Sequence, residues 1–176
     1  MASRVNKSEA KPVAPEYKKG DKVVKAPHGV AIVDSVDVRT ISGCKQKFYT
    51  LTILENGAKI TAAATQVETG ELRKVVDEGA VDEIYEILRD RDVRIDQQTW
   101  NRRNREYTQK INTGSAFEIA SVIRDLVVRQ SGKGLSSREK DMLVAAQSLL
   151  VKEISIAKAS SEEVVREEML ALCSLP

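Results

Sequence analysis

Apolar and polar positions alternate differently in the two halves of the chain. Between Tyr17 and Ala63 the apolar residues recur at every second position in short runs that end at turn residues, which is the period of half-buried β-strands. After Asp77 they recur every three or four positions, the spacing of amphipathic helices. The predicted strands cover residues 22–24, 30–40, 47–54 and 58–63, and helices are expected thereafter.

Turn sequences separate the predicted strands. Asn56-Gly57 is the strongest hairpin signal, because both central residues of a type I′ turn need a positive φ. Ser42-Gly43 marks another turn. Several short strands within about 55 residues indicate a small antiparallel barrel of the SH3 or Tudor type. Such a barrel is too small for an enzyme pocket, but its sheet edges suit partner binding.

Helix-start signals mark the second half. Asp77 is expected to cap a first helix, and Thr99 or Asp96 to cap the helix that holds Trp100. Three Ser-x-x-Glu capping boxes, at 115–118, 136–139 and 160–163, are expected to open further helices. The prediction is an α+β protein. Its parts are a disordered basic arm over 1–16, a small barrel over 17–72 and a compact all-α domain over 77–173.

Charge is distributed unevenly, although the formal net charge is only +2. Residues 67–99 carry five basic and ten acidic groups, whereas residues 101–140 carry nine basic and four acidic groups. A basic block that follows an acidic one suggests an anionic partner, met by one face of the helical domain. Ordinary scatter of solvated charge is the alternative.

Cysteine and histidine usage gives no sign of a metal site, a disulfide or a cofactor. Cys44 and Cys173 lie far apart, and His28 is the only histidine, so neither a CxxC pair nor a zinc cluster can be assembled. No apolar run approaches the roughly 18 residues that a membrane span requires. We therefore expect a soluble, cytoplasmic protein that needs no metal or cofactor.

The only tryptophan stands in an unusual setting. Trp100 opens a predicted helix and is followed by Arg102, Arg103 and Arg105. An apolar wedge beside cations can push between base steps in a minor groove while gripping the phosphates. The alternative is a packing role, in which Trp100 is a partly buried anchor between helices and the arginines form a solvated rim.

Two other basic segments also have two interpretations each. Lys133-Gly134 precedes a predicted helix N-terminus, where N–H groups and positive charge together suit a phosphate; an ordinary helix–helix turn has the same sequence features. Arg39-Thr40-Ile41 ends the longest predicted strand. An arginine there can pair with a carboxylate of a partner, or it can be a plain surface charge.

The chain lacks the common catalytic motifs, since G-x-S-x-G, H-E-x-x-H, a P-loop and G-x-G-x-x-G are all missing. His28 with Asp34 or Cys44 is the best catalytic candidate, but a lone histidine in a Pro-His-Gly turn is usually structural. We therefore expect a protein that is not an enzyme. A DNA-binding regulator and a protein–protein adaptor with no direct DNA role both remain open on this evidence.

Six motifs occur along the chain. They are Tyr17-Lys-Lys-Gly-Asp-Lys-Val-Val, Pro27-His-Gly-Val, Arg39-Thr-Ile-Ser-Gly, Trp100-Asn-Arg-Arg, Val122-Ile-Arg-Asp-Leu and Lys133-Gly-Leu-Ser-Ser-Arg-Glu-Lys-Asp-Met-Leu. In their order and spacing, over residues 17–170, they resemble the CarD/CdnL family of bacterial transcription regulators.

The resemblance implies two tasks for the two domains. In that family a Tudor-like N-terminal domain, shared with transcription-repair coupling factor, docks on the RNA polymerase β subunit. The helical domain meets promoter DNA at the upstream edge of the melted region, where a tryptophan enters the minor groove and stabilises the open complex. Trp100 corresponds to that tryptophan, and Arg39 to a polymerase-binding arginine. Arg102, Arg105 and Lys140 match basic DNA-facing positions.

Together with the other basic residues of the helical domain, these positions define two candidate sites. The candidate DNA-binding residues are Trp100, Arg102, Arg103, Arg105, Arg124, Lys133 and Lys140, and the candidate polymerase-binding residues are Arg39, Thr40, Ile41 and Thr61. We expect a monomer of the bacterial nucleoid that binds promoter DNA largely without sequence preference and makes no membrane contact.

Three positions depart from the family pattern. Thr61 lies where some members have a second polymerase-contacting basic residue, and Ala62-Ala63 replaces an expected Val/Ile-Pro. Lys25-Ala26 stands where Tyr-Pro is common. The departures predict a weaker polymerase contact, or a divergent member with a different partner.

Overall fold

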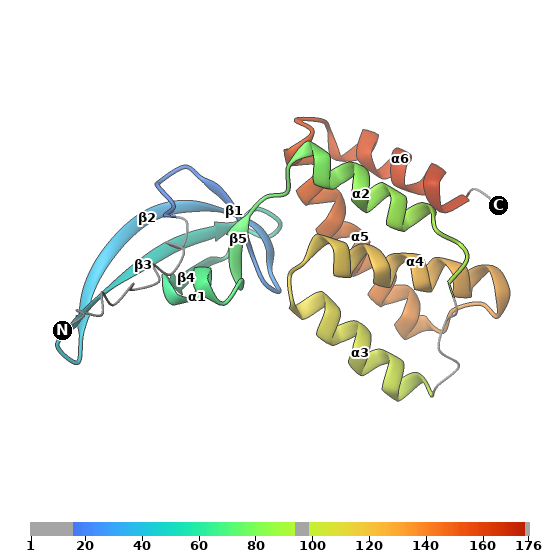
Figure 1. Cartoon of the computed structure of the whole chain (residues 1–176), viewed down its shortest axis with the longest axis horizontal. Coiled ribbons are helices and arrows are strands. Elements are labelled where there is room, and N and C mark those ends of the chain that lie inside the picture. Colours follow the sequence, from blue (N-terminus) through green and yellow to red (C-terminus); the bar gives the residue numbers. More distant parts are fainter. Residues whose placement is uncertain (1–15, 94–98, 175–176) are drawn as a thin grey trace, which may run out of the picture.

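The computed structural model describes residues 16–93 and 99–174. They form two lobes side by side along the long axis of the molecule, one built from a β-sheet and one from helices (Figure 1). The α+β class predicted from the sequence is confirmed. The basic arm predicted over residues 1–16 lies, apart from Glu16, outside the described residues.

One antiparallel sheet forms the first lobe, with its strands in the order β4-β3-β2-β1-β5. The strands are β1 (Lys22–Lys25), β2 (Gly29–Ile41), β3 (Cys44–Ile53), β4 (Lys59–Ala63) and β5 (Leu72–Lys74). Val23, Ala31, Tyr49 and Leu51 share one face of the sheet and are buried there. Because successive side chains point to opposite faces, this burial fixes the register of the strands.

The sheet is not closed into the predicted barrel. β4 and β5 are its two edges, and no strand pairing joins them among the described residues. Between them in the chain lies a single helical turn, α1 (Thr65–Glu68). The sequence predicted neither α1 nor the three-residue β5, because segments this short show too little periodicity.

The tightest hairpin turn lies between β2 and β3. Ser42 and Gly43 both have positive φ angles, 50° and 82°, and they join Ile41 directly to its pairing partner Cys44. Positive φ at both central residues is the type I′ arrangement, whose twist matches that of the flanking strands. This turn therefore has the geometry that the sequence assigned to Asn56-Gly57.

The Asn56-Gly57 segment makes a different turn, so the type I′ prediction for it was wrong. Gly57 has a φ of 70°, but Asn56 is not among the residues with positive φ. Instead, the Asn56 Oδ1 accepts a hydrogen bond from the backbone N–H of Ala58 at 2.9 Å. Such a side-chain turn is a common alternative use of asparagine, and it lies in a connection longer than two residues.

Replacing Ser42 by asparagine is expected to stabilise the protein. Ser42 is held at a φ of 50°, which asparagine tolerates better than serine does, and we expect a gain of about 0.5 kcal/mol. Urea denaturation of the wild type and of Ser42→Asn measures the difference. Ser42→Val serves as the reverse control, because a β-branched residue at positive φ should lower the stability.

Helices form the second lobe. They are α2 (Glu78–Arg89), α3 (Trp100–Asn112), α4 (Ala116–Gly132), α5 (Ser137–Ala157) and α6 (Glu162–Ser174). Helix α4 is central and packs against α2, α3 and α5. Its Ile123 and Leu126 are buried with Ile84 and Leu88 of α2 and Leu150 of α5, so the predicted all-α domain has one continuous apolar core.

The predicted N-caps and capping boxes are formed at some helix starts and not at others. Asp77 caps α2 through its side chain, and Ser136 with Glu139 forms a complete capping box at α5. Ser115 precedes α4, but its side chain makes no capping hydrogen bond. Helix α6 begins one residue later than predicted, and the Ser161 hydroxyl accepts the backbone hydrogen bond there.

Candidate nucleic-acid interface

Helix α3 begins at the tryptophan and has two distinct faces. Trp100 is half-buried, and Arg103 and Tyr107, three and seven residues later, are buried on the same side of the helix. Arg102 and Arg105 are exposed and, at a spacing of three residues, they are neighbours on the helix surface. Trp100 is therefore neither sealed in the core nor fully in solvent.

Arg103 does not belong to an exposed basic surface, contrary to the sequence prediction. Only 5% of its surface is accessible, and its guanidinium forms an ion pair with Glu139 of α5 at 3.3 Å. The reason is helical geometry, since position 103 falls on the core-facing side of α3 between Trp100 and Tyr107. We therefore remove Arg103 from the candidate DNA-binding residues.

Glu139 links three helices at this end of the domain. Its carboxylate accepts hydrogen bonds from Arg103 of α3 at 3.3 Å and from Nε of Arg129 of α4 at 2.9 Å. It also accepts bonds from the backbone N–H and the hydroxyl of Ser136, at 2.9 and 2.8 Å. Burial raises the pKa of the Glu139 carboxyl, but these donors outweigh burial and hold the pKa below its usual value.

Exposed cations lie near this buried cluster in the sequence and at the same end of the domain. Arg102 is adjacent in sequence to Arg103, and Lys140 is adjacent to Glu139, so the ion pair brings the first turns of α3 and α5 together. The exposed members of the predicted DNA-binding set that lie at this end are Arg102, Arg105, Lys133 and Lys140. In the part of the chain that the structure describes, none of them forms an ion pair. We call these four residues and Trp100 the tryptophan surface.

The tryptophan surface lies at the end of the helical lobe that points away from the sheet. The start of α3 and the connection between α4 and α5 are both at this end (Figure 1). Like positive charges gathered without acidic partners favour an anionic ligand, and phosphates are the anions that basic helix termini bind most readily. The half-buried Trp100, the first residue of α3, lies at the same end.

Arg124 lies apart from the tryptophan surface, and this also differs from the prediction. Its guanidinium pairs with Asp125 at 2.8 Å and with Asp90, the residue after α2, at 3.7 Å. Arg124 is mostly buried on the side of α4 that faces α2. Because its charge is compensated by two carboxylates, we remove Arg124 from the candidate DNA-binding residues as well.

The predicted polymerase-binding residues lie on the other lobe. Residues that pair directly across antiparallel strands share a face, and the pairs Arg39–Gln46, Ile41–Cys44 and Thr50–Thr61 place Arg39, Ile41 and Thr61 on the same face. The guanidinium of Arg39 also lies 5.3 Å from the ring centre of Phe48, which helps to hold it in place. Thr40 pairs with Lys45 and points to the opposite face.

The outer part of β2 has a free edge, a feature that the sequence predicted for the sheet in general but did not assign to this segment. β1 pairs with β2 only as far as Ile32, so from Ser35 to Ile41 the described residues pair with β2 on the β3 side alone. Val38 in this segment is 62% exposed, and Val36 is also exposed. An edge with unpaired backbone groups and apolar side chains can accept a further strand from a partner.

Features of other functional classes are not found in the described residues. His28 is exposed in the β1–β2 turn, and no group of three His, Cys, Asp or Glu side chains there is arranged to hold a metal ion. No helix in these residues combines the length and the apolar character that a membrane crossing needs.

Comparison with known families and proteins gives a consistent result. The family model described as "CarD, C-terminal domain" matches residues 83–170, and the one described as "CarD-like/TRCF RID domain" matches residues 17–76. The protein named "Putative transcription factor YdeB" of Bacillus subtilis (strain 168) is 27% identical over 151 residues, which cover 84% of this chain and 95% of the relative.

A solved structure titled "CdnLNt from Myxoccoccus xanthus" is also similar. It shares 35% sequence identity with the chain, covers 39% of this chain and 97% of its own length, and has a TM-score of 0.30. The two family models match adjacent segments in the same order as the two lobes. The chain therefore belongs to the CarD/CdnL family of transcription factors.

Proposed function

We propose that the protein docks on the RNA polymerase β subunit through its sheet and stabilises the promoter open complex with Trp100. The indole enters the minor groove at the upstream edge of the melted DNA. Arg102, Arg105 and Lys140 contact the flanking phosphates. The sequence resemblance implies these tasks, and the features of the two lobes support them.

The observation that carries this proposal is the setting of Trp100. The residue is half-buried at the first position of α3. The fold therefore fixes the backbone that carries the side chain, while part of the ring is accessible. Exposed Arg102 and Arg105 lie on the same helix, and the Arg103–Glu139 ion pair brings Lys140 to the same end. A minor-groove wedge needs this combination of a rigid apolar group and adjacent phosphate contacts.

The docking surface is the outer part of β2 and β3. Arg39 and Ile41 are exposed there, and the edge of β2 beyond Ser35 is unpaired among the described residues. The family model that matches this lobe is described as "CarD-like/TRCF RID domain", and the resemblance implies a domain, shared with transcription-repair coupling factor, that binds RNA polymerase. We infer that this edge and the face that carries Arg39 meet the β subunit.

The proposed DNA contact and the proposed polymerase contact complement each other. The tryptophan surface offers few groups that read base edges, so it cannot select a promoter by sequence. Binding to the polymerase supplies the location, and tethering raises the local concentration of the DNA-binding lobe, so a weak intrinsic affinity for DNA is sufficient.

Transcription with purified bacterial polymerase tests the proposal. Open complexes are formed on a promoter with and without the protein, and their decay is followed after addition of a competitor. We expect a longer lifetime with the protein, and salt-sensitive binding of the protein alone to forked DNA, because phosphate contacts release counterions. An unchanged lifetime together with no binding to forked DNA would contradict the proposal and favour the protein–protein adaptor.

Replacing Arg39 by glutamate is expected to weaken β-subunit binding. Arg39 is exposed on the proposed docking face, and reversing one charge in an interface costs about 2 kcal/mol or more, roughly a thirtyfold loss of affinity. A binding assay with the β subunit measures this. Arg166→Glu on α6, exposed on the other lobe and with the same charge change, is the control and should bind normally.

A further inference from the structure

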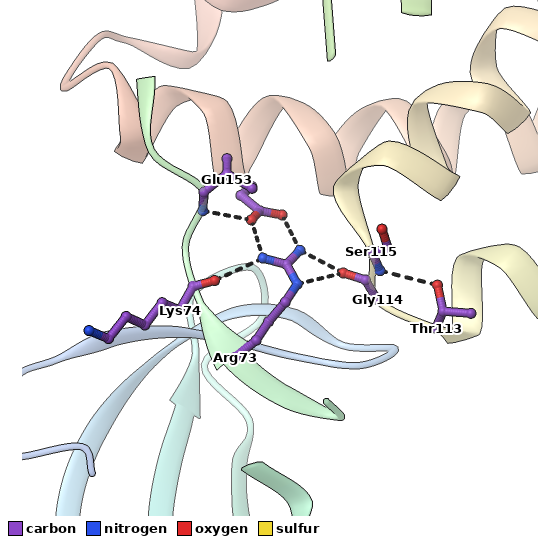
Figure 2. Close-up of polar contacts among 7 residues, drawn as sticks. Arg73, Lys74, Thr113, Gly114, Ser115 and Glu153 are labelled. Carbon is purple, nitrogen blue, oxygen red and sulfur yellow. Dashed lines mark hydrogen bonds and ion pairs between the residues drawn. The ribbon is translucent and has the colours of Figure 1, made fainter. Parts of the chain in front are cut away.

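The two lobes are joined by a largely buried ion pair. Both guanidinium NH groups of Arg73 on β5 contact the carboxylate of Glu153 on α5, at 2.6 and 2.9 Å (Figure 2). Only 3% of the Glu153 side chain is accessible. A bidentate pair has a fixed direction, so it constrains how β5 is oriented relative to α5.

The same arginine also binds the turn between α3 and α4. Its Nε and one NH group donate to the carbonyl of Gly114 at 3.0 and 2.6 Å, and its other NH group donates to the carbonyl of Lys74 at 2.8 Å. Glu153 in turn accepts the backbone N–H of Val76 at 3.1 Å. Arg73 thus connects the sheet both to α5 and to the turn that follows α3 (Figure 2).

Close packing supports these bonds at two glycines. Gly114 has a φ of 71°, and a Cβ there would lie 2.6 Å from the Cβ of Ala26 in the β1–β2 turn. A Cβ on Gly29 would lie 2.8 Å from a methyl group of Leu149 on α5. At both glycines, therefore, the backbone of one lobe packs against a side chain of the other, with no room for a methyl group between them.

Apolar burial completes the contact. Val24, Ala26 and Val30 are buried, yet they belong to neither of the two cores. Val24 and Val30 are paired and lie on the face of the sheet opposite to its own core, next to α5. Domains joined only by a linker are expected to move relative to each other. The contacts described here instead restrict the relative motion of the two lobes.

We propose that Arg73 and Glu153 are positioning residues that lock the two lobes into one rigid unit. The lock holds the tryptophan surface at a fixed distance and angle from the β2–β3 docking face. The functional role of the lock rests on the proposed function. The lock adds that the relative orientation of the two lobes is set within the protein rather than by the polymerase. The departure at Lys25-Ala26 falls at this joint, since Ala26 touches Gly114.

Distance measurements between spin labels test the lock without polymerase or DNA. One label is attached at Cys44, which is exposed at the β2–β3 hairpin. The other is attached at Val144→Cys, an exposed position of α5, in a Cys173→Ser background. We expect one narrow distance distribution, which broadens in Glu153→Gln. A broad distribution in the parent protein would overturn the proposal.

Gly114→Ala provides a second test of the contact between the two lobes, in case Glu153→Gln folds poorly. The added methyl group must displace Ala26, so the distribution should shift or broaden. Gly70→Ala is the matched control, because Gly70 also has a positive φ, 79°, but open space around its Cβ position. Equal effects of the two alanine variants would contradict a role for close packing at the joint.

The functional consequence is measured with the same variants on open complexes. We expect Glu153→Gln to shorten the lifetime severalfold while its affinities for the β subunit and for forked DNA match the wild type. An unchanged lifetime with a broadened distribution would overturn the positioning role. Failure of the proposed function itself is recognised separately, because Trp100→Ala would then leave the lifetime unchanged.

Discussion

Replacing Trp100 by alanine is expected to shorten the lifetime of promoter open complexes by about tenfold or more, equivalent to at least about 1.4 kcal/mol. The indole is the only apolar group that projects from the first turn of α3 beside Arg102 and Arg105. In the proposed mechanism, the opened base step loses its stacking partner when the indole is removed, while the phosphate contacts remain. Lifetimes measured by competitor challenge report the loss.

Three comparisons make this result specific. Trp100→Ala should bind the β subunit as the wild type does, because the substitution lies on the other lobe. Trp100→Phe should retain part of the effect, since a smaller ring still stacks. Val164→Ala removes an exposed apolar group from α6, away from the proposed DNA contact, and should leave the lifetime unchanged. If Trp100→Ala also leaves it unchanged, the wedge has no role.

Local sequence signals predicted the parts of this fold that depend on neighbouring residues. The capping box of Ser136 and Glu139 lies within four positions, so a local sequence pattern could predict it. The alternation of β2 and β3 likewise gave the strands. The sequence predicted the type I′ turn at Asn56-Gly57, but the structure has it at Ser42-Gly43. Strand pairing along the whole β2–β3 hairpin, and not the composition of the turn, determines which turn is tight.

The candidate site was predictable only in part, because burial depends on contacts between distant segments. Arg103 looks like its neighbours Arg102 and Arg105 in the sequence. Its acceptor Glu139 is 36 positions away, and no local pattern connects them. The pair Arg73–Glu153, 80 positions apart, was invisible for the same reason.

Glu139 is the residue on which the geometry of the tryptophan surface depends. Its carboxylate holds Arg103 of α3 and Arg129 of α4 at the first turn of α5. Removing it breaks a buried ion pair and a capping box together, and breaking a buried pair costs about 3 kcal/mol or more. We therefore expect Glu139→Ala to lower the free energy of unfolding by about 3 kcal/mol.

A second variant with the same sequence signature provides the control. Ser115 and Glu118 have the spacing of a capping box, but the Ser115 side chain makes no capping bond. Glu118→Ala should therefore cost less than about 0.5 kcal/mol, as surface substitutions usually do. Urea denaturation compares the two. A similar loss in both variants would show that Glu139 acts only as an ordinary helix-start glutamate.

The pH dependence separates the charge of Glu139 from its volume. Because its pKa is lower in the folded protein than in the unfolded chain, the carboxylate stabilises the fold at neutral pH. That stabilisation is lost as the pH falls from the ordinary glutamate value through the lowered pKa. Glu139→Gln keeps the size but cannot ionise, so it should be less stable than the wild type at pH 7, and the gap should narrow in acid. A gap that stays constant with pH would mean that packing, and not the shared carboxylate, holds α3, α4 and α5 together at the tryptophan surface.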